Sequence, residues 1–100
     1  MAITVRTNRI NFFAQSTKPQ VYLVYIMNTK YIPWEFCMRI LINVFHKNIQ
    51  DAHSITNEII TNGEGLCGAY PFEIAETKAE IVELQAKEDG FSLDCLIEEV

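Results

Sequence analysis

The segment 66–78 joins a short apolar run to a charged helix start through a single proline, and it restricts the fold more than any other stretch. The run 66–70 is apolar apart from one glycine, which indicates a mostly buried strand. Pro71 cannot donate to a sheet ladder but suits a corner or the first turn of a helix. Glu73 and Glu76 then carry negative charge where a helix N-terminus favours it. The segment therefore predicts a strand that turns directly into a helix and presents a rigid, charged surface.

The charged surface at the start of this helix carries no catalytic group. It contains no nucleophile beside a base and no set of metal ligands, which indicates a surface for binding another protein. The two histidines, His46 and His53, have no Cys or His at metal-ligand spacing, and the chain has no Gly-rich phosphate loop. We therefore expect no enzyme, no cofactor and no metal. The surface consists of Glu73, Glu76, Thr77 and Lys78.

Hydrophobic periodicity and turn residues predict six elements in the order strand, helix, helix, strand, helix, strand. Pro33 opens the first helix at its first position, and Asn62-Gly63 ends the second with a left-handed cap. In the third helix, small residues such as Ala75 and Ala79 form a narrow inner face that allows close approach to a sheet. Three strands with helices stacked on one face make an α+β domain of two layers. The predicted ranges are strands 21–27, 66–70 and 91–97 and helices 33–45, 51–61 and 72–88.

Charge divides the chain into a basic start and an acidic body. Residues 1–34 hold four bases and no acid, whereas residues 35–100 hold thirteen acids and four bases. An acidic body argues against binding to nucleic acid, which needs a basic face. No stretch approaches the roughly 18 uninterrupted apolar residues of a membrane span, so we expect no membrane partner.

One hundred residues predict one domain, and its first part is an arm. Residues 1–19 are polar and aperiodic except for Ile10, Phe12 and Phe13, which predicts a flexible arm that is disordered or orders on contact. The core domain is predicted to span residues 20–100. The three cysteines are odd in number and each lies in an apolar run, which favours buried free thiols in a reducing compartment.

Two motifs resemble the signature of the ClpS adaptor family. A strand ending in Cys67-Gly68 is followed by a short turn and by Glu-hydrophobic-Ala-Glu-Thr-Lys at 73–78. Upstream, residues 28–36 are similar to the family's Asn-Asp-Asp-Tyr-Thr-Pro-Met-Glu-Phe segment. The motifs are spaced as in the family, and the likeness runs from about Lys18 to the C-terminus. The resemblance implies the same element order with an antiparallel three-stranded sheet. The upstream matches are Asn28, Tyr31, Pro33, Glu35 and Phe36.

The family delivers proteins bearing certain N-terminal residues, called N-degrons, to AAA+ unfoldases of the Clp protease. The four residues of the charged surface match the family's unfoldase-docking face in identity and spacing. The resemblance thus implies a non-enzymatic, monomeric adaptor whose partners are the N-terminal domain of a Clp AAA+ unfoldase and the N-termini of substrate proteins. Its flexible arm would engage the pore of the unfoldase. The implied location is the bacterial cytoplasm, or an organelle of bacterial origin.

The amine site that the family uses to hold an N-degron is altered in this chain. In the family an Asn, an Asp and a His hold the free amine, because an ammonium needs charged or polar acceptors. Asn28 matches the Asn, but Thr29 stands at the Asp position and Ile60 at the His position. Lys30 adds a positive charge where the family has a second Asp. We therefore expect weak recognition of N-terminal amines.

A neighbouring apolar pocket takes the first side chain of the N-degron in the family. Trp34 stands where the motif has a Met and is large enough to fill the pocket itself. Plain core packing is the alternative role for Trp34, Ile59 and Ile60. The residues that match the pocket are Trp34, Cys37, Thr56, Ile59 and Leu93.

Two alternative functions stand beside the delivery of N-degron substrates. The first is a modulator that docks on the unfoldase without recognising N-degrons. The second is a structural module like the C-terminal domain of the ribosomal stalk protein, whose fold is similar. The missing alanine-rich hinge and the acidic third helix argue against the second alternative.

Overall fold

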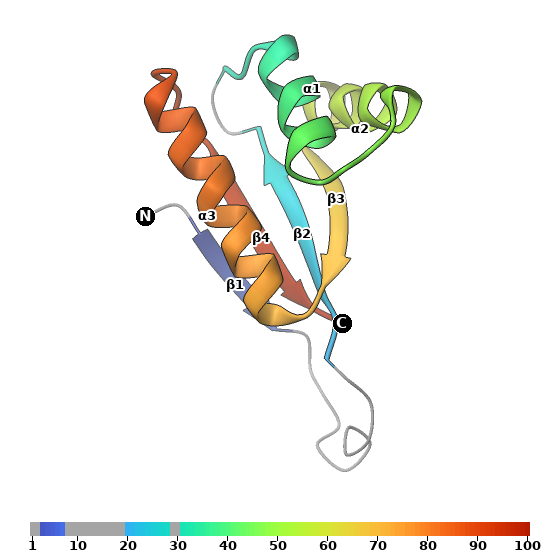
Figure 1. The fold of residues 1–100 in the computed structure, drawn as a ribbon, viewed down its shortest axis with the longest axis vertical. Coiled ribbons are helices and arrows are strands. Elements are labelled where there is room, and N and C mark those ends of the chain that lie inside the picture. Colours follow the sequence, from blue (N-terminus) through green and yellow to red (C-terminus); the bar gives the residue numbers. More distant parts are fainter. Residues whose placement is uncertain (1–2, 8–19, 29–30) are drawn as a thin grey trace.

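The computed structural model describes residues 3–7, 20–28 and 31–100, and Figure 1 follows them along the chain. Within these residues the chain forms four strands and three helices. In chain order they are β1 (Ile3–Thr7), β2 (Tyr22–Met27), α1 (Trp34–Asn43), α2 (Ile49–Asn62), β3 (Glu64–Tyr70), α3 (Phe72–Glu88) and β4 (Asp94–Glu99).

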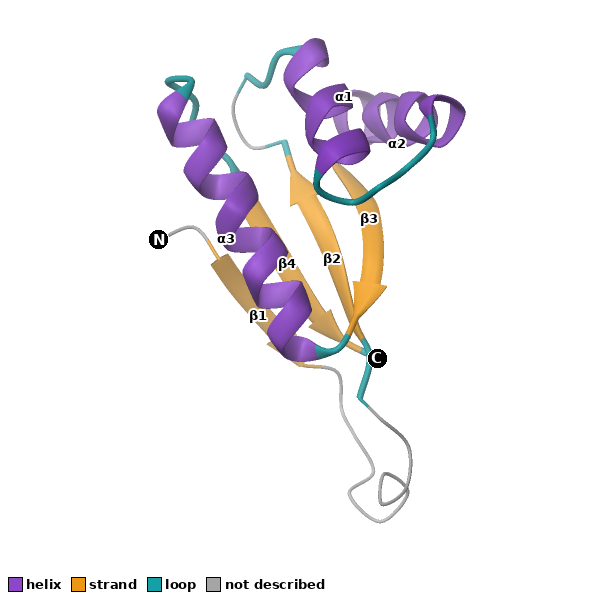
Figure 2. Ribbon diagram, in the orientation of Figure 1, coloured by secondary structure: helices purple, strands orange, loops and turns teal. Residues whose placement is uncertain are grey.

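The sheet has the strand order β1-β4-β2-β3, and the helices pack on one of its faces (Figure 2). β2 pairs antiparallel with both β3 and β4. These three strands are the antiparallel sheet that the sequence predicts, and with the helices they follow the order β-α-α-β-α-β. The α+β fold class with two layers is therefore confirmed.

The first strand corrects the prediction for the N-terminal arm. Residues 3–7 form β1, which pairs parallel with β4 at the edge of the sheet, whereas the sequence predicted a flexible arm over residues 1–19. Four of the five residues of β1 are β-branched, which suits a strand, and its pairing partner lies at the other end of the chain. Five residues carry too short a pattern to reveal such a distant partner. The remaining residues of the predicted arm lie outside the described residues.

The ends of the helices follow their capping residues. α2 begins at Ile49, two residues before the prediction, because Asn48 Oδ1 accepts a hydrogen bond from Asp51 N at 2.7 Å. At its other end, Gly63 adopts the left-handed conformation (φ 89°) that the sequence predicts for this cap.

The end of α3 explains why β4 starts later than predicted. Gly90 is left-handed (φ 86°), and its N donates to Lys87 O at 3.1 Å. Phe91 N donates to Ala86 O at 2.7 Å, so residue 91 closes the helix and β4 begins only at Asp94. α1 likewise ends at residue 43 rather than at about 45, while α3 has the predicted range.

The cysteines lie in the hydrophobic core between the sheet and the helices. Cys37, Cys67 and Cys95 are buried and unpaired, as the sequence predicts. Burial raises the pKa of the Cys37 thiol to about 11, and it raises the pKa of the Cys67 and Cys95 thiols well above the ordinary value. All three thiols are therefore protonated at neutral pH, the form that is the weaker nucleophile.

α2 packs closely on the backbone where β3 begins. A Cβ added at Gly65 would lie 2.6 Å from Ile59 Cγ1 and 3.1 Å from Ile55 O. Because the backbone oxygen cannot move aside cheaply, we expect Gly65→Ala to lower the free energy of unfolding by about 1–3 kcal/mol. Urea denaturation measures this change, with Glu64→Ala on the exposed neighbour as the control, expected to shift it by less than about 0.5 kcal/mol. An unchanged value for Gly65→Ala would contradict this account of the packing.

Candidate protein-binding site

The start of α3 is held rigidly against the sheet. Pro71 has an extended backbone (φ −57°, ψ 155°), and its carbonyl accepts a hydrogen bond from Ala75 N at 2.9 Å. Phe72 packs edge-to-face on Tyr22 of β2, with ring centroids 5.0 Å apart. Because Ala75 is also fully buried, the first turn of the helix is fixed, and it presents Glu73 to solvent.

The four predicted docking residues share this end of α3 but differ in exposure. Glu73 and Thr77 are exposed, whereas Glu76 and Lys78 are partly buried. Thr77 Oγ1 donates to Glu73 O at 2.8 Å, so its hydroxyl hydrogen is used within the helix. Glu73 is therefore the most accessible charge of the predicted face.

Lys78 forms its contacts inside the molecule. Its Nζ donates to Val44 O at 2.6 Å and lies 5.1 Å from the centre of the Tyr70 ring and 5.9 Å from that of Phe45. The ammonium thus joins α3 to the end of α1, with two aromatic rings beside it. An ammonium has three N–H donors, so its bond to Val44 leaves donors for a partner.

An exposed isoleucine lies among the predicted docking residues. Ile74 follows Glu73 directly, and 47% of its surface is accessible. Ile74 lies outside the buried stripe of α3, and this position in the helix pattern identifies an exposed apolar residue. The docking prediction did not include Ile74. An apolar side chain among charges is typical of the centre of a protein interface. The buried stripe consists of Ala75, Ala79, Val82 and Ala86.

The second predicted site lies where β2 meets the end of α2. Asn28 N donates to Gly63 O at 2.8 Å, which ties the end of the strand to the cap of the helix. Ile60 lies in the last turn before that cap, and its side chain is 40% exposed. Thr29, the third residue predicted for the amine site, lies outside the described residues. The described part of the site thus offers an apolar surface where the family pattern has a histidine.

Most of the predicted side-chain pocket is buried. Four of its five residues are inaccessible or nearly so, and three of these belong to the hydrophobic core. The fourth, Thr56, has a buried hydroxyl with no hydrogen-bond partner among the described residues, which typically costs about 1–3 kcal/mol. The four are Cys37, Thr56, Ile59 and Leu93.

Trp34 is the accessible member of that set. It begins α1, and 38% of its surface is exposed. Its ring packs edge-to-face on the ring of His53 in α2, with centroids 5.0 Å apart. Trp34 therefore lies across the surface between α1 and α2 rather than within the core.

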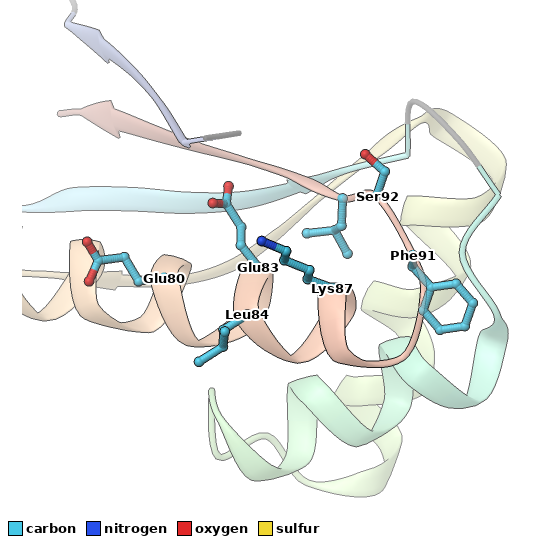
Figure 3. Close-up of a pocket in the computed structure, with 7 residues that line it drawn as sticks. Glu80, Glu83, Leu84, Lys87, Phe91 and Ser92 are labelled. Carbon is cyan, nitrogen blue, oxygen red and sulfur yellow. The ribbon is translucent and has the colours of Figure 1, made fainter.

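A cavity of about 520 Å³ lies beside the C-terminal half of α3 (Figure 3). Of the predicted site residues, Leu93 is the one that lines it. Figure 3 shows Glu83 and Lys87 on one side of the helix and Leu84 on another. The cavity combines two carboxylates and an ammonium with apolar walls, and it is distinct from the docking residues at the start of α3. Its lining residues are Glu80, Glu83, Leu84, Lys87, Phe91, Ser92 and Leu93.

Fold and surfaces together define a small α+β protein-binding domain. One of its surfaces is a rigid helix start that combines exposed charge with an exposed isoleucine. Among the described residues, no helix is long and apolar enough to span a membrane, and no three His, Cys, Asp or Glu side chains are grouped to hold a metal ion.

Comparison with known proteins identifies the family. The family "ATP-dependent Clp protease adaptor protein ClpS" matches residues 17–96 of this chain. The ClpS adapter of Nitratidesulfovibrio vulgaris is 43% identical over 82 residues, which cover 82% of this chain and 79% of that protein. The ClpS adapter of Helicobacter hepaticus is 39% identical over 83 residues, 83% of this chain and 84% of that protein.

A solved structure agrees with these sequence matches. The structure of Agrobacterium tumefaciens ClpS2 bound to L-phenylalaninamide has a TM-score of 0.77 to this chain at 29% sequence identity. The match covers 83% of this chain and 100% of that one. The chain belongs to the ClpS family, the adaptor proteins of the ATP-dependent Clp protease.

Proposed function

We propose that this chain docks through the start of α3 on the N-terminal domain of a Clp AAA+ unfoldase and changes which substrates the Clp protease degrades. It acts as a monomer in the cytoplasm of a bacterium and carries out no reaction itself. The observation that supports this most directly is the rigid first turn of α3, which exposes Glu73 beside Ile74. Apolar contact supplies affinity at such an interface, and the surrounding charges set orientation and specificity.

Titration with purified N-terminal domains of Clp unfoldases tests the proposal. We expect saturable binding with one molecule of this chain per domain and an affinity in the micromolar range or tighter. Isothermal calorimetry measures the affinity and the ratio together. The absence of binding to every Clp unfoldase of the host would overturn the proposed function.

A second candidate function is a docking modulator that does not bind N-degrons. The Agrobacterium relative was solved with L-phenylalaninamide, a ligand with a free amine and an aromatic side chain. Here Ile60 exposes an apolar side chain at the predicted amine site, and Trp34, a residue of the predicted side-chain pocket, packs on His53. An ammonium gains no acceptor from Ile60, so this arrangement favours docking without N-degron recognition.

Deletion of residues 1–19 separates docking from the effect on degradation. We expect the truncated protein to bind the unfoldase N-terminal domain within about threefold of the full chain, because the docking residues lie on α3. We expect its effect on ATP-dependent degradation of a model substrate to be lost, because the arm no longer engages the pore. A Gly-Ser replacement of residues 8–19 with equal length, which retains β1, is the matched control. Loss of docking on deletion would show that the arm belongs to the binding surface.

A further inference from the structure

The outer edge of the sheet at β4 is occupied by the other end of the chain. β1 pairs parallel with β4, from Ile3 opposite Cys95 to Thr7 opposite Glu99. The other edge of β4 is paired with β2 along its whole length (Figure 1). β1 therefore covers the remaining row of backbone N–H and C=O groups on β4.

The core between the sheet and the helices includes residues of β2 and β4. α3 packs on β4, β2 and β3, and these elements supply the buried residues of the sheet, such as Val24, Ile26 and Ile97. β1 is a five-residue edge strand held by parallel pairing, which is slightly weaker per residue than antiparallel pairing. Strands of this kind open locally at a much lower free energy than the core. Opening of β1 would leave the pairing of β4 with β2 and of β2 with β3 in place.

The negative charge of β4 is complementary to the positive charge of β1, the strand that occupies its outer edge. The register pairs Arg6, the one charged residue of β1, with Glu98. β4 carries Asp94, Glu98 and Glu99 and no base. β1 is otherwise composed of β-branched residues, which favour extended backbone. The edge thus suits an extended, β-branched segment that carries positive charge.

We propose that the outer edge of β4 is a strand-binding site for extended basic polypeptide segments, and that residues 3–7 are its exchangeable occupant. When β1 leaves, a segment of another polypeptide with the same chemistry adds to β4 as a parallel strand. Main-chain hydrogen bonds to β4 supply the affinity, as in other cases of strand addition, and Glu98 favours a basic residue at the matching position. This inference concerns backbone pairing at the edge of the sheet and does not depend on the unfoldase partner.

Hydrogen exchange on the full-length protein tests whether β1 caps the edge. Successive backbone N–H groups of a strand point to opposite sides, so only one of residues 4 and 5 donates a hydrogen bond to β4. Of the variants Thr4→Pro and Val5→Pro, one therefore removes a donor to β4, and the other serves as its matched control. We expect one of the two to make the β4 amides that are not bonded to β2 exchange at least about tenfold faster. Amides of β2 and β3 should be unchanged. Equal exchange in the unmodified chain and in both variants would overturn the proposal.

A peptide added in trans tests the binding site itself. A fluorescent peptide with the sequence of residues 2–8 is titrated against the proline variant that exposes the edge and against the unmodified protein. We expect the exposed variant to bind at least about tenfold more tightly, because β1 no longer competes. Changing Arg6 of the peptide to Glu should weaken binding, and Glu98→Lys in the protein should reverse that preference. Equal affinity for both proteins, or a preference unaffected by Glu98→Lys, would overturn the proposal.

Discussion

Replacing Glu73 and Lys78 together with alanine is expected to lower affinity for the unfoldase N-terminal domain by at least about 30-fold, which takes a micromolar Kd to tens of micromolar or weaker. Each charge at the edge of an interface typically contributes about 1 kcal/mol, and more when its partner is desolvated, so two together reach about 2 kcal/mol or more. Glu73 is exposed on the fixed first turn of α3, and Lys78 keeps donors available beside its bond to Val44. Calorimetric titration measures the loss.

A matched control lies on the same helix. Glu80→Ala with Lys87→Ala removes one acid and one base from exposed positions further along α3, so the net charge changes by the same amount. We expect this variant to bind within about threefold of the unmodified chain. Undiminished affinity in the Glu73 and Lys78 double variant would exclude the docking assignment, and an equal loss in the control would show that general charge rather than the start of α3 matters.

The internal role of Lys78 requires one further variant. Lys78→Ala leaves the carbonyl of Val44 without its donor, and Val44 is itself buried, so part of any effect is a loss of stability of about 1 kcal/mol. Glu73 accepts the hydrogen bond from Thr77 through its backbone carbonyl, so Glu73→Ala alone keeps that bond and isolates the docking contribution. Circular dichroism of both variants confirms that the fold survives.

The sequence predicts most of the fold because local residues specify where the helices begin and end. Pro33, Gly63 and Pro71 mark helix starts and ends by their backbone restrictions, and the structure places element boundaries beside each of them. β1 is different, since its five residues become a strand only by pairing with β4 some ninety positions away. No local pattern specifies such a partner.

The positions of the candidate site residues could be predicted from the sequence, but their side-chain contacts could not. The register of α3 distinguishes its buried stripe from the exposed start that carries Glu73. The bond from Lys78 to Val44 joins residues 34 positions apart, and it depends on where the tertiary fold places the end of α1 relative to α3. Burial of Cys37 and Thr56 likewise depends on how closely α1 and α2 approach, which periodicity alone does not determine.

Peptides that begin with Phe, Leu, Trp or Tyr are expected to bind the unmodified protein weakly or undetectably. In the sequence the neutral Thr29 and the cationic Lys30 follow Asn28, and Ile60 brings an apolar, partly exposed side chain to the predicted amine site. Loss of a charged acceptor from such a site costs roughly 2–4 kcal/mol, which is about 30- to 1000-fold in affinity. Fluorescence anisotropy with labelled peptides measures the binding.

Restoring the acceptors should reverse this loss. We expect Thr29→Asp with Ile60→His to strengthen binding of the same peptides, because a carboxylate and an imidazole then accept hydrogen bonds from the N-terminal amine. Thr29→Asn with Ile60→Gln supplies polar groups of similar size without the negative charge, and it should recover less. If polarity alone were sufficient, the two double variants would bind equally well. Micromolar or tighter binding to the unmodified chain, lost when the peptide is acetylated at its N-terminus, would contradict the prediction, because the free amine would then be held by acceptors other than residues 29 and 60.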